Sequence, residues 1–256
     1  KEISKKLNIG LSSLVFIDDS KFECNQVKKT IPEVMTLKLS DDPSEFIEIL
    51  ESASPFYFNN ISKEDLSRVS TYKKITKINS KIENSKNLES FLKSLKSQVV
   101  IEKISKKNCE RSSQLIAKTN QFKLNSKLFS SKELIQKDAL CINYKDIHQD
   151  YGNIGVVIYK IKEGKELTIE NWVMSCRVFS RRIEFFIIEF LLDKAIKNKC
   201  GHLSFRFLKS EKNLYLQEFL NNLGLNIKDQ NQNFKVNKDQ IKKIIYKNYI
   251  KAKVLL

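Results

Sequence analysis

The sequence predicts two successive units, a short α/β unit followed by a larger α+β unit. The chain has 256 residues, of which 41% are hydrophobic, and this is enough for one large or two ordinary domains. Residues 12–51 read as strand, helix, strand, helix. From residue 97 the order becomes strand, helix, three strands, helix, strand, helix, which is typical of an α+β fold. We therefore place the first unit at 1–58, a polar helical linker at 59–96 and the second unit at 97–256.

The first unit is predicted from the apolar run Leu14–Ile17, which reads as a buried parallel strand. A helix is expected over 20–30, a second strand over 34–39, and a further helix from Asp42 to Glu51. Asp18 and Asp19 follow the first strand at its carboxyl end, the edge of an α/β sheet where ligands bind. Two carboxylates there suit Mg²⁺. The alternative is that one of them caps the next helix.

The second unit is predicted from alternating apolar patterns and from turn residues. Strands are expected at 99–104, 139–146, 153–161, 166–178 and 202–208, and helices at 108–122, 182–199 and 213–225. The sequences GNIG and KEGK provide the turns between the three consecutive strands. Gly224 provides the stop signal of the last helix.

The formal net charge of +16 is the most unusual feature of the composition. Basic proteins bind nucleic acids, anionic membranes or acidic proteins. The alternative, which we favour, is a general bias toward lysine, and an acidic protein partner comes second. No nucleic-acid-binding signature is present. The most apolar stretch, 183–196, contains three acidic residues and is shorter than a membrane span.

The five cysteines have no paired spacing, which indicates reduced thiols rather than disulfides or a zinc site. The first residues are polar and show no signal peptide. We therefore expect a cytoplasmic protein with neither a membrane nor a nucleic acid as its partner.

A cluster of arginines marks the predicted junction between a strand and the long helix. The sequence SCRVFSRRIE contains Arg177, Arg181 and Arg182 beside the helix start, where free backbone amides and the helix dipole favour anions. Such a junction can hold the pyrophosphate of coenzyme A or the phosphate of a carrier-bound pantetheine arm. The alternative is that the arginines cover the surface or pair with Glu170 and Glu184.

Three further residues are candidates for chemistry. Cys176 lies beside the arginines and is a possible thiol nucleophile, although a cysteine more often packs as a small hydrophobic residue. Asn120 and Gln121, in the sequence KTNQF, can bind a substrate amide or can cap the preceding helix.

Taken together, these motifs resemble the FkbH-like proteins. The sequences LNIGLSSLVFIDDSKFE, IPEVMTLKLSDDP, SKEDLSRVSTY, QLIAKTNQFKLNSK, DYGNIGVV and SCRVFSRRIE match that family in order, over nearly the whole chain and least well after about residue 225. FkbH-like proteins are similar to a haloacid dehalogenase (HAD) phosphatase fused to a GNAT-like acyltransferase domain. The resemblance thus implies the remnant of a HAD-type Rossmann-like domain followed by an α+β GNAT-like domain.

The resemblance assigns roles to the candidate residues. Asp18 and Asp19 match the motif that completes a HAD Mg²⁺ site, whereas the family's nucleophile motifs lie upstream and are absent here. The family usually reads CRVLGRGVE where this chain reads CRVFSRRIE, so Ser180 and Arg182 stand at glycine positions. The family also tends to have Phe-Gly where this chain has His148 and Gln149.

The sequence therefore predicts an amino-terminally truncated acyltransferase. It would move a glyceryl-type or other small acyl group to or from the phosphopantetheine thiol of an acyl carrier protein, with a small phosphorylated acyl donor. In this hypothesis Asn120 and Gln121 position the acyl group, while Arg177 and Arg181 hold phosphate. Mg²⁺ would bind only with the missing HAD portion. The alternatives are an acetyl-coenzyme A-dependent N-acetyltransferase and a non-catalytic module that docks a carrier protein or binds a polyanion.

Overall fold

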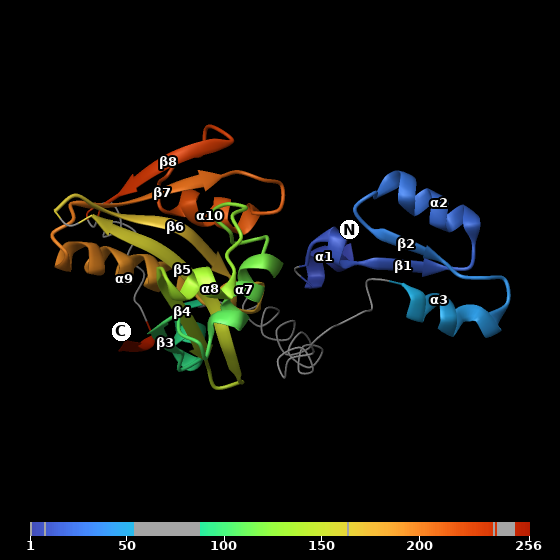
Figure 1. The fold of residues 1–256 in the computed structure, drawn as a ribbon, viewed down its shortest axis with the longest axis horizontal. Coiled ribbons are helices and arrows are strands. Elements are labelled where there is room, and N and C mark those ends of the chain that lie inside the picture. Colours follow the sequence, from blue (N-terminus) through green and yellow to red (C-terminus); the bar gives the residue numbers. More distant parts are fainter. Residues whose placement is uncertain (1, 8, 54–87, 163, 238, 240–248) are drawn as a thin grey trace. The chain divides into compact units, whose positions relative to one another are not determined.

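The computed structural model describes residues 2–7, 9–53, 88–162, 164–237, 239 and 249–256, and the chain divides into two compact units (Figure 1). The first unit contains the elements from α1 to α3, and the second contains those from α6 to β9. The predicted boundary at 58/59 lies outside the described residues. No helix within the described ranges is both long and apolar enough to cross a membrane.

The first unit is built around two parallel strands, β1 (Val15–Asp18) and β2 (Met35–Lys38). Their register pairs Val15 with Met35 and Asp18 with Lys38. The helices that accompany them in the described part of this unit are α1 (Glu2–Leu7), α2 (Lys21–Thr30) and α3 (Phe46–Ser52). Ser20 caps α2 by accepting the N–H of Glu23. The strand–helix–strand–helix order predicted for this unit is confirmed.

The second unit is a seven-stranded mixed sheet with helices on both faces (Figure 1). Its strands are β3 (Gln98–Lys103), β4 (Asp138–Lys145), β5 (Asp150–Lys162), β6 (Glu166–Met174), β7 (His202–Leu208), β8 (Asn231–Val236) and β9 (Lys251–Leu255). Its helices are α6 (Leu88–Ser94), α7 (Cys109–Lys118), α8 (Ser131–Ile135), α9 (Ile183–Lys197) and α10 (Leu214–Asn222).

The strands lie in the order β8-β7-β6-β5-β4-β3-β9. Strands β3 to β6 pair in antiparallel fashion; short turns join β4 to β5 and β5 to β6, whereas α7 and α8 lie between β3 and β4. Helix α9 then crosses over, so that β7 pairs with β6 in parallel, and β9 pairs with β3 in parallel at the other edge. The predicted α+β organisation of this unit is confirmed.

The core lies on both faces of the sheet, because alternating residues of the central strands are buried in opposite directions. Cys141, Val156 and Val173 cluster with residues of α7 and α8 on one face. Trp172, the neighbour of Val173, packs instead against Phe219 of α10, with ring centroids 5.6 Å apart. Burial on two faces explains the long apolar runs in β5 and β6.

A short inserted segment lies between β6 and β7. These two strands pair only from Glu166–His202 to Ile169–Phe205, and we call the gap beyond that pairing the β6–β7 notch. Within it, the backbone of Phe122 and Leu124 bonds to β6: Leu124 N–H donates to the Trp172 carbonyl at 3.1 Å, and Met174 N–H donates to the Phe122 carbonyl at 3.0 Å. On the other side, Leu208 N–H of β7 donates to the Leu124 carbonyl at 2.9 Å. The segment therefore joins the two diverging strands.

Several boundaries differ from the sequence prediction. Helix α7 ends at Lys118 rather than at residue 122, because the following residues leave the helix to enter the notch. Strand β6 ends at Met174, and its predicted last residues form the loop before α9. Three further elements, α8, β8 and β9, were not predicted, because they are short or polar and lack clear periodicity.

Gly155 offers a test of the packing between β5 and β6. A Cβ atom at this position would lie 3.2 Å from the Val173 carbonyl oxygen and 3.3 Å from Met174 Cγ, and the backbone oxygen is held in the sheet. We expect Gly155→Ala to lower the free energy of unfolding by about 1–3 kcal/mol in denaturant titrations. Gly201→Ala is the matched control, because a Cβ there meets nothing within 4 Å. Equal effects of the two substitutions would contradict this close packing.

Candidate functional site

The loop from Ser175 to Arg182 joins β6 to α9 and contains most of the predicted site residues. Its first part is a 3-10 turn, Cys176–Val178, in which the Ser175 hydroxyl accepts the N–H of Arg177. Its second part has two non-glycine residues in the left-handed region, Ser180 with φ 66° and Arg182 with φ 58°. Both positions suit glycine best, since a side chain there costs about 1 kcal/mol or more. They are the two positions at which the FkbH-like resemblance predicts glycine.

An aromatic contact with α10 holds the left-handed turn in place. The Ser180 N–H donates to the Tyr215 hydroxyl at 3.0 Å, and the rings of Phe179 and Tyr215 stack at 3.6 Å with an angle of 4° between their planes. The Tyr215 hydroxyl donates in turn to Glu184 Oε1 at 3.1 Å. The loop is thus fastened to both helices that cover this face of the sheet.

The structure gives Arg181 a different role from the predicted phosphate ligand. Its side chain is 1% exposed, and its Nε lies 3.4 Å from Asp146 Oδ2, which is fully buried. Its other nitrogens donate to the Phe179 carbonyl at 3.2 Å and the Tyr151 hydroxyl at 3.0 Å. A bound phosphate could reach this guanidinium only by displacing these partners. Arg181 therefore supports the loop from inside.

Arg177, Arg182 and Cys176 lie closer to the surface, each half-buried. Arg177 donates from Nε to the Ser175 hydroxyl at 3.0 Å and from Nη2 to the Asn153 carbonyl at 3.2 Å. Arg182 is the N-cap residue of α9, so its backbone stands at the positive end of the helix dipole. The predicted phosphate-binding role of these two arginines, and of Ser180, stays a prediction, as does the nucleophilic role of Cys176.

Asn120 and Gln121 lie between the end of α7 and the notch. Asn120 is exposed and Gln121 is half-buried, and the carbonyl of Gln121 accepts the N–H of Leu216 in α10 at 3.2 Å. The next residue, Phe122, places its ring 6.5 Å from that of Phe179. The structure thus brings the KTNQF and SCRV sequences together, although they are about fifty residues apart. Their predicted role in positioning an acyl group is not tested by this arrangement.

Glu184 is a titrating group that was not predicted from the sequence. Its carboxyl group is fully buried in the first turn of α9, its Oε2 has no hydrogen-bond partner, and burial raises its pKa to about 7. The bonds from its own backbone N–H and from Tyr215 oppose that rise. Its position in an apolar run of the predicted helix was the sequence signal for its burial, because an acidic residue on the apolar face of a helix points into the core.

The phosphate end of a coenzyme A or phosphopantetheine ligand fits the loop better than its arm fits the notch. The loop offers Arg177, Arg182 and the start of a 15-residue helix. An extended arm with amide groups would pair with a strand edge, but the edge of β6 is already bonded to Phe122 and Leu124. The space beside this junction is therefore filled by the chain itself.

The predicted Mg²⁺ ligands in the first unit do not form a metal site in the described part of the chain. Asp18 Oδ1 accepts the N–H of Ser20 at 2.8 Å, which is the capping alternative, and Asp19 is exposed. No group of three or more metal-ligating side chains occurs among the described residues. Two carboxylates alone do not complete the octahedral shell that Mg²⁺ requires.

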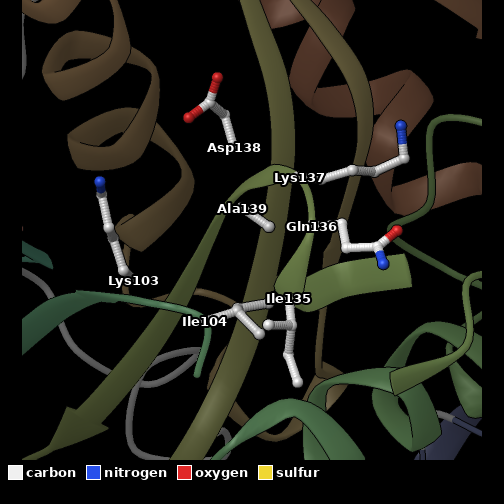
Figure 2. A pocket seen from close by; sticks show the side chains of 7 residues that line it. All are labelled: Lys103, Ile104, Ile135, Gln136, Lys137, Asp138 and Ala139. Atoms are coloured by element: carbon white, nitrogen blue, oxygen red, sulfur yellow. The ribbon is translucent and has the colours of Figure 1, made fainter. Parts of the chain in front are cut away.

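A pocket of about 300 Å³ lies elsewhere in the second unit, where β3 ends and β4 begins (Figure 2). It is lined by Lys103, Ile104, Ile135, Gln136, Lys137, Asp138 and Ala139. Lys137 also pairs with Glu170 at 3.0 Å. None of the predicted site residues lines this pocket.

Comparison with known proteins finds similar folds among solved acetyltransferases. No family model matches the chain, and no curated protein matches it. Among solved structures, the ribosomal-protein-S18-alanine N-acetyltransferase from Escherichia coli is similar at 13% identity over 48% of this chain and 76% of that chain, with a TM-score of 0.36. Ard1 from Thermoplasma volcanium is similar at 10% identity over 54% and 94%, with a TM-score of 0.40. An N-acetyltransferase from Staphylococcus aureus Mu50 is similar at 12% identity over 49% and 80%, with a TM-score of 0.37.

These neighbours concern the fold of about half of the chain. The HAD identity of the first unit and membership in the FkbH-like family find no support in the comparisons and stay predictions.

Arg181→Met tests the internal role of Arg181. Removing one partner of a buried ion pair leaves Asp146 uncompensated, so we expect the free energy of unfolding to fall by about 3–5 kcal/mol in denaturant titrations. The double variant Arg181→Met, Asp146→Leu should recover part of this loss. Arg206→Met, which changes an exposed arginine of β7, is the control. A loss no larger than that of the control would contradict the buried pair.

Glu184→Gln tests the buried carboxyl group. The pKa of Glu184 is raised from about 4.5 to about 7 in the folded protein. The contribution of its protonated carboxyl group to the free energy of unfolding is therefore complete below pH 4.5 and is lost as the pH rises toward 7. A shift of this size corresponds to about 3 kcal/mol. Relative to wild-type, the variant should therefore gain stability between pH 5 and pH 8, measured by urea unfolding. Glu211→Gln, on an exposed turn, controls for the loss of one carboxylate. A difference between variant and wild-type that does not change with pH would contradict the raised pKa.

Proposed function

We propose that the second unit is an acyltransferase that takes an acyl group from a coenzyme A thioester and passes it to an amine. The observation that supports this proposal is the loop before α9, which combines two left-handed residues, a helix start and two half-buried arginines. A phosphate group at this loop would gain backbone N–H donors and positive charge at once. The thioester, when bound, supplies the activated acyl carbon.

Individual residues of the loop would share the binding of the diphosphate. Arg177 is anchored at Ser175 and Asn153, so its guanidinium is held in a defined direction. Arg182 adds a second guanidinium at the helix start. Tyr215 and Arg181 would act by positioning, since they hold the backbone of Ser180 and Phe179. Glu184 would keep the turn attached to α9 through Tyr215.

A carrier protein is a second candidate for the donor. Its phosphopantetheine carries the same kind of phosphate, and the net charge of +16 would speed its encounter with an acidic partner. This is the donor that the FkbH-like resemblance implies, with a glyceryl-type acyl group. Loading that group from a small phosphorylated donor would need a nucleophile and a metal site, which the resemblance places in motifs that this chain lacks.

A non-catalytic role is favoured by one specific observation, the filled notch. If the arm of a thioester cannot reach the sheet, the loop would hold the phosphate end of a carrier without acyl transfer. Mass spectrometry distinguishes the three candidates. The protein is incubated with acetyl-coenzyme A and a set of amines, or with an acylated carrier protein, and the acceptors are weighed. Transfer from acetyl-coenzyme A supports the first candidate, transfer from the carrier only supports the second, and binding without any mass gain supports the third.

Arg177→Ala tests the loop directly by calorimetry with coenzyme A. Loss of a charge-assisted contact with phosphate is worth about 1.5–3 kcal/mol, so we expect binding to weaken by about tenfold or more. Arg206→Ala removes the same charge from an exposed position of β7 and should leave the affinity nearly unchanged. If both variants bind coenzyme A equally well, the loop is not the site. If the wild-type protein does not bind coenzyme A at all, the proposed donor is wrong.

A further inference from the structure

We propose that Phe122 determines which ligands the loop accepts. The loop binds a nucleotide diphosphate, whereas Phe122 keeps the notch closed to a pantetheine arm. This inference rests on the phosphate binding that the proposed function assigns to the same loop, and a closed notch favours the third candidate, binding without acyl transfer. It starts from the segment Phe122–Leu124, which lies between β6 and β7 and forms an isolated antiparallel bridge with Val173.

The segment occupies the backbone positions that an arm would use. The arm of coenzyme A is extended and carries amide groups, so a strand edge is its natural partner. One edge of β6 is paired with β5, and the other faces the notch next to the loop. On that second edge, the Trp172 carbonyl accepts a hydrogen bond from the Leu124 N–H, and the Met174 N–H donates one to the Phe122 carbonyl.

The segment is also fastened to its other neighbours. Leu208 N–H of β7 bonds to the Leu124 carbonyl, and the Asn213 side-chain amide donates to the Lys123 carbonyl at 3.3 Å. On the opposite face from Phe122, the Lys123 ammonium donates to the Ile116 carbonyl near the end of α7 at 2.7 Å. The segment is thus held from both strands and from both layers of helices.

The Phe122 side chain fills the space above this backbone. It is fully buried and lies within 4.9–6.5 Å, between ring centroids, of four other rings, those of Trp172, Phe179, Tyr215 and Phe219. Opening the notch would expose this ring and break the backbone hydrogen bonds that Phe122 and Leu124 make with β6 and β7. The free energy needed to expose the ring and to break these hydrogen bonds limits the open form to roughly one molecule in ten thousand. An arm that needs the open form would lose affinity by the same factor.

Calorimetry with two probes tests the inference. Coenzyme A carries the arm, and 3′-phosphoadenosine diphosphate is the same molecule without it. For the wild-type protein we expect equal affinities within about threefold, because the arm gains no contact in the notch. For Phe122→Ala we expect coenzyme A to bind at least about tenfold more tightly than the shorter probe, because opening no longer exposes the ring.

Phe219→Ala is the matched control, since it removes a ring from the same cluster but leaves the notch segment unchanged. It should destabilise the protein without favouring coenzyme A. Phe122→Leu replaces the alanine variant if that protein does not fold, and a smaller preference in the same direction is expected. Tighter binding of coenzyme A than of the short probe by wild-type, by tenfold or more, would overturn the inference and leave the proposed function standing.

Two measurements without ligand test closure independently of the proposed function. Trp172 is the only tryptophan of the chain and touches the Phe122 ring, so its fluorescence reports on the notch. We expect acrylamide to quench it poorly in wild-type and well in Phe122→Ala, and the backbone amides of Leu124 and Met174 to exchange slowly. Rapid exchange or efficient quenching in wild-type would overturn the inference. Slow exchange without binding of either probe would support the closed notch and contradict the proposed function.

Discussion

The backbone bridge from β6 through Phe122–Leu124 to β7 is the constraint on which the second unit depends. Two parallel strands that diverge leave unpaired N–H and C=O groups, and buried groups of this kind must find partners. In this protein the partners come from a segment located after α7 in the sequence. Because that segment also carries a fully buried phenylalanine, the same contact satisfies the backbone and completes the aromatic core beside α9 and α10.

The loop before α9 shows how strain is held at a candidate site. Serine and arginine occupy left-handed positions there, and neither residue favours that conformation by itself. Hydrogen bonds from Ser180 to Tyr215 and from Arg181 to Phe179 hold the backbone on both sides of the turn. The internal supports of this turn are two buried ionisable groups, Arg181 and Glu184.

Much of the fold could be predicted from the sequence, because the spacing of apolar residues is most regular in segments whose side chains are buried in the core. The meander of three strands and the long helix that ends at Lys197 follow directly from apolar runs and turn residues, whereas β1 was expected to be buried and is only partly so, with Ile17 38% exposed. Short elements such as α8 and β9 were missed because they lack a clear period. The arginine cluster at the strand–helix junction was also predicted, but Arg181 and Arg177 carry the same charge in the sequence and only their surroundings distinguish them.

The sequence by itself determined the two-unit organisation, the α+β character of the second unit and the position of a cationic loop at a helix start. These features depend on local spacing and side-chain type, which the order of residues contains. Only the tertiary structure decided that Phe122 leaves the helix to enter the sheet, that Arg181 turns inward to Asp146, and that Glu184 is buried without a partner for one oxygen. Each of these depends on contacts between segments far apart in the chain, whose free energy no local pattern records.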